Sequence, residues 1–265
     1  MDLPQELIDE ITCNLASDIP SLLSCSSVAK SWIYPSRRWL FKDVLVSRGT
    51  RQRWLDRISP TNVELLHNIR SFTYITDSNA WGGNPLYRIY SSSFHRYLPS
   101  LCRLENLGLH AMSLGPDVPQ QIGLFSTFQY TLSSLRLRDC RVTSNALITL
   151  INYFPLLADL DLWSVDYAAV SEPAPRLSRP LRGRLGIAYC GSEDRALFNK
   201  LSNPPPELDE LVLYWVDMPT FYDAILGVHG GSVKCLKMTD SGGYKRRMSC
   251  NPQIFPTLTR NTNSQ

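Results

Sequence analysis

The stretch Leu132-Ser-Ser-Leu135-Arg-Leu137-Arg-Asp-Cys140 decides the fold of this chain. Its apolar-x-apolar pair follows another apolar residue three positions earlier, which is typical of a strand with one buried face. The same arrangement returns along most of the sequence and predicts seven strands. The first residues of the recurring pairs are Phe72, Leu107, Leu135, Leu160, Leu185, Leu211 and Leu236.

The spacing of these pairs is nearly constant. Successive steps are 35, 28, 25, 25, 26 and 25 residues, and chance alternation would not keep the last four so even. The period lies in the range of about 20–29 residues that leucine-rich repeats use, and residues 132–140 are similar to that template. Residues 145–154 have the apolar spacing of an outer helix. We therefore expect an α/β leucine-rich-repeat solenoid over residues 67–265, with inner parallel strands and outer helices and loops.

Three segments interrupt the period and predict exposed loops. Residues 77–85 are rich in turn-forming residues, while residues 171–180 and 203–206 each hold three prolines, which oppose a full outer helix. A further strand is due near residue 261, where the sequence is polar. A frayed tail, a loose cover by residues 239–258 and a chain shorter than its relatives all fit this end, so an incomplete repeat domain is one expectation.

The first forty residues predict three short helices, because apolar residues recur there at helical spacing. Pro4 suits the first turn of the first helix, and Asp18-Ile19-Pro20 separates it from the second. The third is expected after Ser31, with Pro35 in its first turn. The apolar residues of the three helices are Leu7, Ile8, Ile11 and Leu15, then Leu22, Leu23, Cys25 and Val28, then Trp32, Trp39, Leu40 and Phe41.

This helical segment has more apolar side chains than three short helices can bury among themselves. A helical domain of this size is marginal alone and usually leans on a partner or on a neighbouring domain. One interpretation is therefore a cap packed on the rest of the chain. The other is a docking module whose surplus apolar face contacts another protein.

Residues 1–46 resemble an F-box. The resemblance is carried by Leu3-Pro4-x-Glu6-Leu7-Ile8-x-x-Ile11, by Leu22-Leu23-x-Cys25-x-x-Val28-x-x-Ser31-Trp32 and by Arg37-Arg38-Trp39-Leu40-Phe41. Pro35 departs from the pattern, since a helix former is expected there. Together with the period, the resemblance gives the expected organisation: a small F-box-like helical domain at 1–46, a helical connector at 47–66 and the leucine-rich-repeat-like domain at 67–265.

The resemblance also implies a function. An F-box docks on the Skp adaptor of a Skp–cullin–F-box ubiquitin ligase, and the repeats would hold a target protein, so the chain would be a non-catalytic substrate receptor. The residues that match the apolar positions of the F-box, and that would contact the adaptor, are Leu3, Pro4, Leu7, Ile8, Ile11, Leu15, Leu22, Leu23, Val28 and Trp32. A repeat scaffold capped by its own helices is the alternative.

Composition narrows the classes of partner. The 265 residues hold 27 Lys and Arg against 24 Asp and Glu, a net charge of +3, which is small for a protein that binds nucleic acid through phosphate contacts. The acidic start lacks a signal-peptide core, and the apolar stretch 146–158 is too short to span a bilayer, so no membrane association is expected. Seven cysteines without a C-x-x-C pair favour the cytoplasm or nucleus.

Enzymatic motifs are not found in the sequence. It has no nucleophile elbow, phosphate-binding loop, dinucleotide fingerprint or zinc-protease motif, and the four histidines lie far from any paired cysteines, so we expect no cofactor and no metal. Asp159 and Asp161, two apart on one strand, favour a charged strand face over acid–base catalysis. We read residues 229–232 as a turn and Lys245-Arg246-Arg247 as solvated surface.

The predicted strands leave a strip of mostly polar residues opposite their apolar anchors. It runs through Thr73, His110, Arg136, Arg138, Asp159, Asp161, Trp163, Arg184, Glu210, Val212, Tyr214, Lys237 and Thr239. Tryptophan, tyrosine and arginine dominate binding hot spots, although any sheet that faces water also needs polar residues. The candidates for target binding are His110, Arg136, Arg138, Asp159, Asp161, Trp163, Tyr214 and Lys237.

Overall fold

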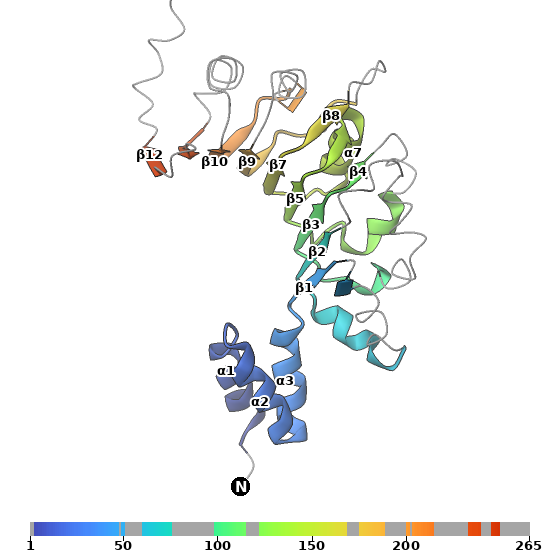
Figure 1. Ribbon diagram of the computed structural model, residues 1–265, viewed down its shortest axis with the longest axis vertical. Coiled ribbons are helices and arrows are strands. Elements are labelled where there is room, and N and C mark those ends of the chain that lie inside the picture. Colours follow the sequence, from blue (N-terminus) through green and yellow to red (C-terminus); the bar gives the residue numbers. More distant parts are fainter. Residues whose placement is uncertain are drawn as a thin grey trace, which may run out of the picture.

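The computed structural model describes most of the chain between Leu3 and Ser249. The described ranges are 3–47, 49–50, 60–75, 98–114, 122–168, 175–188, 200–201, 203–214, 233–239 and 245–249. Within them the fold is mixed α/β, with three N-terminal helices followed by a largely parallel sheet. Figure 1 shows the helices at one end of a curved row of strands.

The first helices are α1 (Gln5–Asn14), α2 (Ile19–Val28) and α3 (Lys30–Leu40). Helix α3 packs against both of the others. The side chain of Asp18 starts α2, because one carboxylate oxygen accepts a hydrogen bond from the Ser21 backbone N–H at 3.2 Å and the other from the Ser21 hydroxyl at 2.6 Å. The sequence thus predicts all three helices correctly.

Pro35 lies inside α3 rather than in its first turn, so the expectation for its position is wrong. The helix begins at Lys30, after the extended residue Ala29, which places Pro35 in the second turn. A proline at this depth removes one backbone donor, the one that would bond the carbonyl of Ser31. The ring of Pro35 and the side chain of Ser36 are both buried, so this part of α3 forms the inner side of the helical segment.

The main sheet has nine strands in the order β1-β2-β3-β5-β7-β9-β10-β11-β12, which is the order of the chain. All neighbours are parallel except β12, which runs antiparallel to β11. The strands are β1 (Asp43–Val46), β2 (Ser71–Ile75), β3 (Asn106–His110), β5 (Ser134–Arg138), β7 (Asp159–Trp163), β9 (Arg182–Ala188), β10 (Glu207–Tyr214), β11 (Cys235–Thr239) and β12 (Lys245–Ser249).

The register of the sheet follows the period of the sequence. The residues that open the seven apolar pairs are direct partners across neighbouring strands, in the order Phe72, Leu107, Leu135, Leu160, Leu185, Leu211 and Leu236. All seven are buried. The nearly constant step therefore places equivalent side chains in one continuous row, and the seven predicted strands are confirmed.

A second, three-stranded sheet follows the ends of β3, β5 and β7. It contains β4 (Ser113–Leu114), β6 (Arg141–Thr143) and β8 (Asp166–Ala168), all parallel. Ala111, Asp139 and Ser164 make the turns into these strands with positive φ angles of 55°, 51° and 53°. Each of their N–H groups donates a hydrogen bond to the last carbonyl of the next strand in the main sheet, at 2.8–2.9 Å. The turn geometry thus repeats with the strands.

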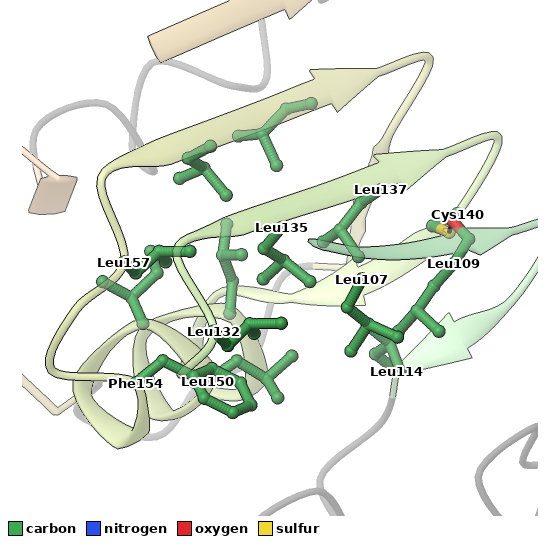
Figure 2. Packing of buried hydrophobic residues seen from close by; sticks show 14 of the residues in the cluster. Leu107, Leu109, Leu114, Leu132, Leu135, Leu137, Cys140, Leu150, Phe154 and Leu157 are labelled. Atoms are coloured by element: carbon green, nitrogen blue, oxygen red, sulfur yellow. Dashed lines mark hydrogen bonds between the residues drawn. The ribbon is translucent and has the colours of Figure 1, made fainter. Parts of the chain in front are cut away.

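Helical elements lie on the other side of the main sheet from its polar residues. Helix α7 (Ser144–Tyr153) confirms the helix predicted for residues 145–154, and Thr143 caps it by accepting from the Ala146 N–H. Short 3-10 helices are η1 (Pro60–Asn68), η4 (Leu98–Ser100) and η5 (Ile122–Phe128). Figure 2 shows strand leucines such as Leu135 directed toward Leu150 and Phe154, which fill the space between sheet and helix.

The described elements can be compared with the expected segments. Strand β1 lies within the predicted range 1–46 but belongs to the main sheet, so the helices end at Leu40. Part of the expected helical connector at 47–66 is the 3-10 helix η1. Residues 77–85, residues 171–174 and the strand expected near 261 lie outside the described residues, whereas 175–180 and 203–206 carry no helix or strand.

Candidate functional site

The helical segment, residues 3–40, exposes most of the large apolar side chains that the described part of the chain leaves in contact with solvent. Ten large hydrophobic residues are exposed there, and seven of them belong to this segment. Those seven are Leu3, Leu7, Ile11, Ile19, Leu23, Val28 and Tyr34. Soluble monomers rarely expose many large apolar side chains close together, and surfaces that do so are commonly interaction sites.

The exposed side chains follow helical stripes. Leu7 and Ile11, four residues apart on α1, are 45% and 38% exposed, and Leu3 precedes them at the same spacing with 48%. Ile19 and Leu23 repeat the pattern on α2. The residues that form the small core lie directly beside these stripes, because Ile8 and Leu22 are only 1% and 0% exposed.

The ten predicted adaptor-binding residues therefore divide into two groups. Ile8 and Leu22 hold the three helices together, and Leu15 and Trp32 are half-buried. The remaining six are exposed and available to a second molecule, namely Leu3, Pro4, Leu7, Ile11, Leu23 and Val28. Sequence reasoning did not include Ile19 and Tyr34, whose exposed fractions of 47% and 61% place them with this group.

The main sheet carries its polar residues on the face opposite the buried rows, and we call this the polar face. Strand alternation and the register produce three rows on it. The first row is Ser71, Asn106, Ser134, Asp159, Arg184, Glu210 and Cys235; the second is Thr73, Gly108, Arg136, Asp161, Gly186, Val212 and Lys237; the third is Ile75, His110, Arg138, Trp163, Ala188, Tyr214 and Thr239.

Arg184 organises the charges at the centre of the polar face. Its Nη1 lies 3.0 Å from Asp159 Oδ1 and 3.9 Å from Asp161 Oδ2, and its Nε lies 3.6 Å from Glu210 Oε2. Glu210 also pairs with Lys237 on the next strand. The result is a network over four neighbouring strands in which one guanidinium serves three carboxylates, each at most 28% exposed.

Asp161 is the least solvated carboxylate of this network. Burial raises the pKa of its carboxyl group, Arg184 and Arg136 oppose that shift, and Asp159 adds to it. The Oδ1 atom is buried and has no hydrogen-bond partner among the described residues. Gly186 makes room for it, because a Cβ atom at that position would lie 2.2 Å from Asp161 Oδ1. A glycine on this face is thus required by a close approach.

The third row places aromatic and cationic groups side by side. The Arg138 guanidinium lies 5.2 Å from the centroid of the Trp163 ring, which is itself 5.2 Å from the Tyr214 ring. His110 precedes Arg138 in the same row, and burial, together with the nearby Arg138 charge, lowers its pKa. The row thus combines an exposed arginine with a half-buried imidazole and two half-buried aromatic rings, and arginine, tryptophan and tyrosine are the residue types that dominate binding hot spots.

The structure brings the eight predicted target-binding residues onto one face, as the period indicates. Arg136 and Arg138 are exposed, whereas the other six are half-buried. Arg184 and Glu210 were not among those eight candidates, although they connect Asp159, Asp161 and Lys237. Their membership of the same row was visible in the sequence, but their pairing depends on register. Val212, expected on this face, is buried at 3% exposure.

Other sequence expectations concern thiols, metals and membranes. The described cysteines are all free, and burial raises the pKa of the Cys140 thiol to about 11, so this group is inert packing. No cluster of three possible metal ligands occurs among the described residues. None of the helices in the described ranges combines the length and the apolarity needed to cross a bilayer. Residues 229–232 lie outside the described part, and Lys245, Arg246 and Arg247 form part of β12.

The whole chain was compared with known proteins in two ways. Neither a scan against protein-family models nor a search of curated proteins returned a match for this chain. The helical segment and the polar face therefore remain the two features of the chain that point to a function.

Proposed function

We propose that this chain is the substrate-receptor subunit of a Skp–cullin–F-box ubiquitin ligase. In this proposal, the helical segment docks on the Skp adaptor and through it on a cullin, while the polar face holds a target protein. The chain supplies no chemistry itself. It raises the effective concentration of the target near a ubiquitin-charged conjugating enzyme, and ubiquitin transfer takes place elsewhere in the complex.

The observation that carries the proposal is the exposure of the F-box-like apolar residues. A three-helix segment that only capped the sheet would pack these side chains on its own chain. Instead, Leu23 and Val28 are 55% and 70% exposed, which favours a docking surface over the capping alternative. The buried Ile8 and Leu22 give the segment a minimal core of its own.

The proposal also takes the main sheet as the inner side of a leucine-rich-repeat solenoid. Three repeating features support this assignment: the in-register row of buried leucines, the sequential parallel order of the strands, and the positive-φ turn that follows each of β3, β5 and β7. Solenoids of this kind present their inner strands as an extended binding surface. The polar face, with its arginines and aromatic rings, is the corresponding surface here.

The adaptor-docking part is tested by changing exposed residues. Each leucine or isoleucine that becomes fully buried on docking contributes roughly 1.5–3 kcal/mol. The double variant Leu7→Ala/Ile11→Ala should therefore weaken adaptor binding by on the order of a hundredfold or more. We would measure it by calorimetry with purified adaptor and the full-length chain, and expect a thermal midpoint close to that of the unchanged protein.

Two matched variants serve as controls. Leu156→Ala removes a leucine that is more exposed, at 56%, outside the helical segment, and should leave adaptor affinity unchanged. Ile8→Ala removes a fully buried side chain and should destabilise the segment by about 2–5 kcal/mol. Unchanged adaptor affinity in a folded Leu7→Ala/Ile11→Ala protein would contradict the docking assignment and would favour the scaffold alternative.

A further inference from the structure

A pocket of about 210 Å³ lies where the helical segment meets the main sheet. Its walls come from the end of α3, from the end of η1, from the segment between η4 and β3, and from the residues that directly precede β1, β2 and β3. The lining residues are Arg38, Trp39, Lys42, Asn68, Arg70, Arg103 and Glu105. The pocket is thus separate from both surfaces described above.

The backbone around the pocket is fixed by a ladder of hydrogen bonds. The carbonyl of Lys42 accepts from the N–H groups of Arg70 and Ser71 at 2.8 and 3.0 Å, and the carbonyl of Arg70 accepts from those of Glu105 and Asn106 at 2.8 and 2.9 Å. Lys42, Arg70 and Glu105 therefore occupy equivalent positions on adjacent strands. This arrangement holds their side chains along one edge of the sheet.

The pocket is strongly cationic. Four cationic side chains and one carboxylate line it, which gives a formal charge of +3. Glu105 is already engaged, because its Oε1 lies 2.6 Å from Arg70 Nη1. The Lys42 ammonium lies 5.2 Å from the Trp39 ring centroid, and Arg38 and Arg103 have no carboxylate partner among the described residues. Positive charge concentrated in a concave site attracts anions.

Asn68 supplies an independent indication of a ligand. This residue is 5% exposed, lines the pocket, and has a buried side-chain Nδ2 without a hydrogen-bond partner among the described residues. A buried donor that stays unpaired costs about 1–3 kcal/mol, so such groups normally have a partner. Because this atom is itself inaccessible to solvent, an oxyanion oxygen in the pocket would provide a partner once the Asn68 side chain rotates toward the pocket.

We propose that this pocket is a binding site for a small phosphate-bearing anion with two or more phosphate groups. Guanidinium groups recognise phosphate oxygens through paired donors, and a charge of +3 matches a polyanion better than a single carboxylate. Liquid water occupies about 30 Å³ per molecule, so the volume suits a compact solute and not a folded protein segment. The bound anion would join α3 to the first three strands. This inference does not depend on the proposed function.

The test uses pyrophosphate as the probe and the full-length protein. Calorimetry at fixed ionic strength should give saturable 1:1 binding, tighter than that of inorganic phosphate, and the thermal midpoint should rise with pyrophosphate concentration. Arg38→Gln and Arg103→Gln should each weaken pyrophosphate binding at least tenfold. Asn68→Asp, which replaces a donor by an acceptor, should abolish binding while circular dichroism reports an unchanged fold.

Arg37→Gln is the matched control, because it removes the same charge from the same turn of α3 but from a residue that does not line the pocket. It should change pyrophosphate affinity less than twofold. Equal losses for Arg37→Gln and Arg38→Gln would reveal non-specific attraction by net charge and overturn the proposal. Absence of saturable binding to the unchanged protein, or full affinity in either Arg38→Gln or Arg103→Gln, would overturn it as well.

Discussion

At the scale of single residues, most charged side chains at the centre of the polar face are paired with one another. Arg184 serves three carboxylates from neighbouring strands, and Lys237 pairs with one of them. Arg136 and Arg138 are the exposed cations at the β5 side of this network, and Arg138 is itself paired, because its Nε lies 3.6 Å from Asp139 Oδ2. Within the described residues, the face is therefore neutralised at its centre and basic toward β5.

Asp161 gives this network a defined pH dependence. Because burial raises its pKa above the ordinary value of 3.8, the folded state holds the proton more tightly than the unfolded chain does. Ionisation of Asp161 therefore costs stability as the pH rises above 3.8. We predict that Asp161→Asn increases the free energy of unfolding at pH 7, and that this gain shrinks as the pH falls toward 4, in urea titrations at several pH values.

Asp159→Asn is the matched comparison on the same strand. Asp159 accepts hydrogen bonds from Arg184 Nη1 at 3.0 Å and from the Ser134 hydroxyl at 3.2 Å. Its replacement should lower the free energy of unfolding at pH 7 by about 1 kcal/mol, given the partial exposure of the pair. Equal losses in both variants would show that Asp161 acts as an ordinary ion-pair partner.

At the scale of elements, the periodic strands were predictable and the two outermost strands were not. The seven predicted strands have apolar pairs, and a parallel sheet in chain order requires them to align. Strand β1 is only four residues long and lies inside the range that resembles an F-box. Strand β12 reads Lys-Arg-Arg-Met-Ser, without apolar alternation, and pairs antiparallel, so neither its composition nor the period could indicate it.

Strand β12 covers the edge of β11. Its five residues pair with Cys235–Thr239, and this contact occupies backbone groups that would otherwise be open to another chain. We predict that removal of residues 245–265 leaves a folded protein that self-associates at micromolar concentration, while the full chain remains monomeric in light scattering. If the truncated chain stays monomeric, β12 is not what prevents self-association through the edge of β11.

The membership of the polar face was predictable from the sequence, but the contacts within it were not. Strand alternation identifies which residues share a face, so the eight target-binding candidates could be placed together from the sequence. Which carboxylate meets Arg184 depends on side-chain directions across four strands, and a sequence pattern does not contain them. The pocket beside Asn68 was not anticipated, because its residues come from three separate stretches of the chain.

At the scale of the whole molecule, the two proposed docking surfaces lie on different parts of the chain. Figure 1 shows the helical segment beyond β1 and the strands of the polar face farther along the row. Changes at one surface should therefore leave the other intact, since distant sites usually act independently.

This separation predicts that each of two double variants weakens one interaction and leaves the other unchanged. Trp163→Ala/Tyr214→Ala removes the paired rings of the third row and should eliminate specific co-purified proteins while adaptor affinity stays within twofold. Leu7→Ala/Ile11→Ala should do the reverse. Both would be followed by affinity purification from cells and quantitative mass spectrometry, with adaptor and other proteins scored separately. Loss of the adaptor in the Trp163→Ala/Tyr214→Ala protein would contradict two independent surfaces.

The alternation within each strand has a consequence for how such a protein can change over time. Residues that hold the sheet together and residues that would meet the proposed target alternate along the same five-residue segments, such as β5 and β7. A substitution at an outward position alters what is recognised without disturbing the interior leucines. Selection can therefore retune specificity one position at a time, while the scaffold beneath remains the same.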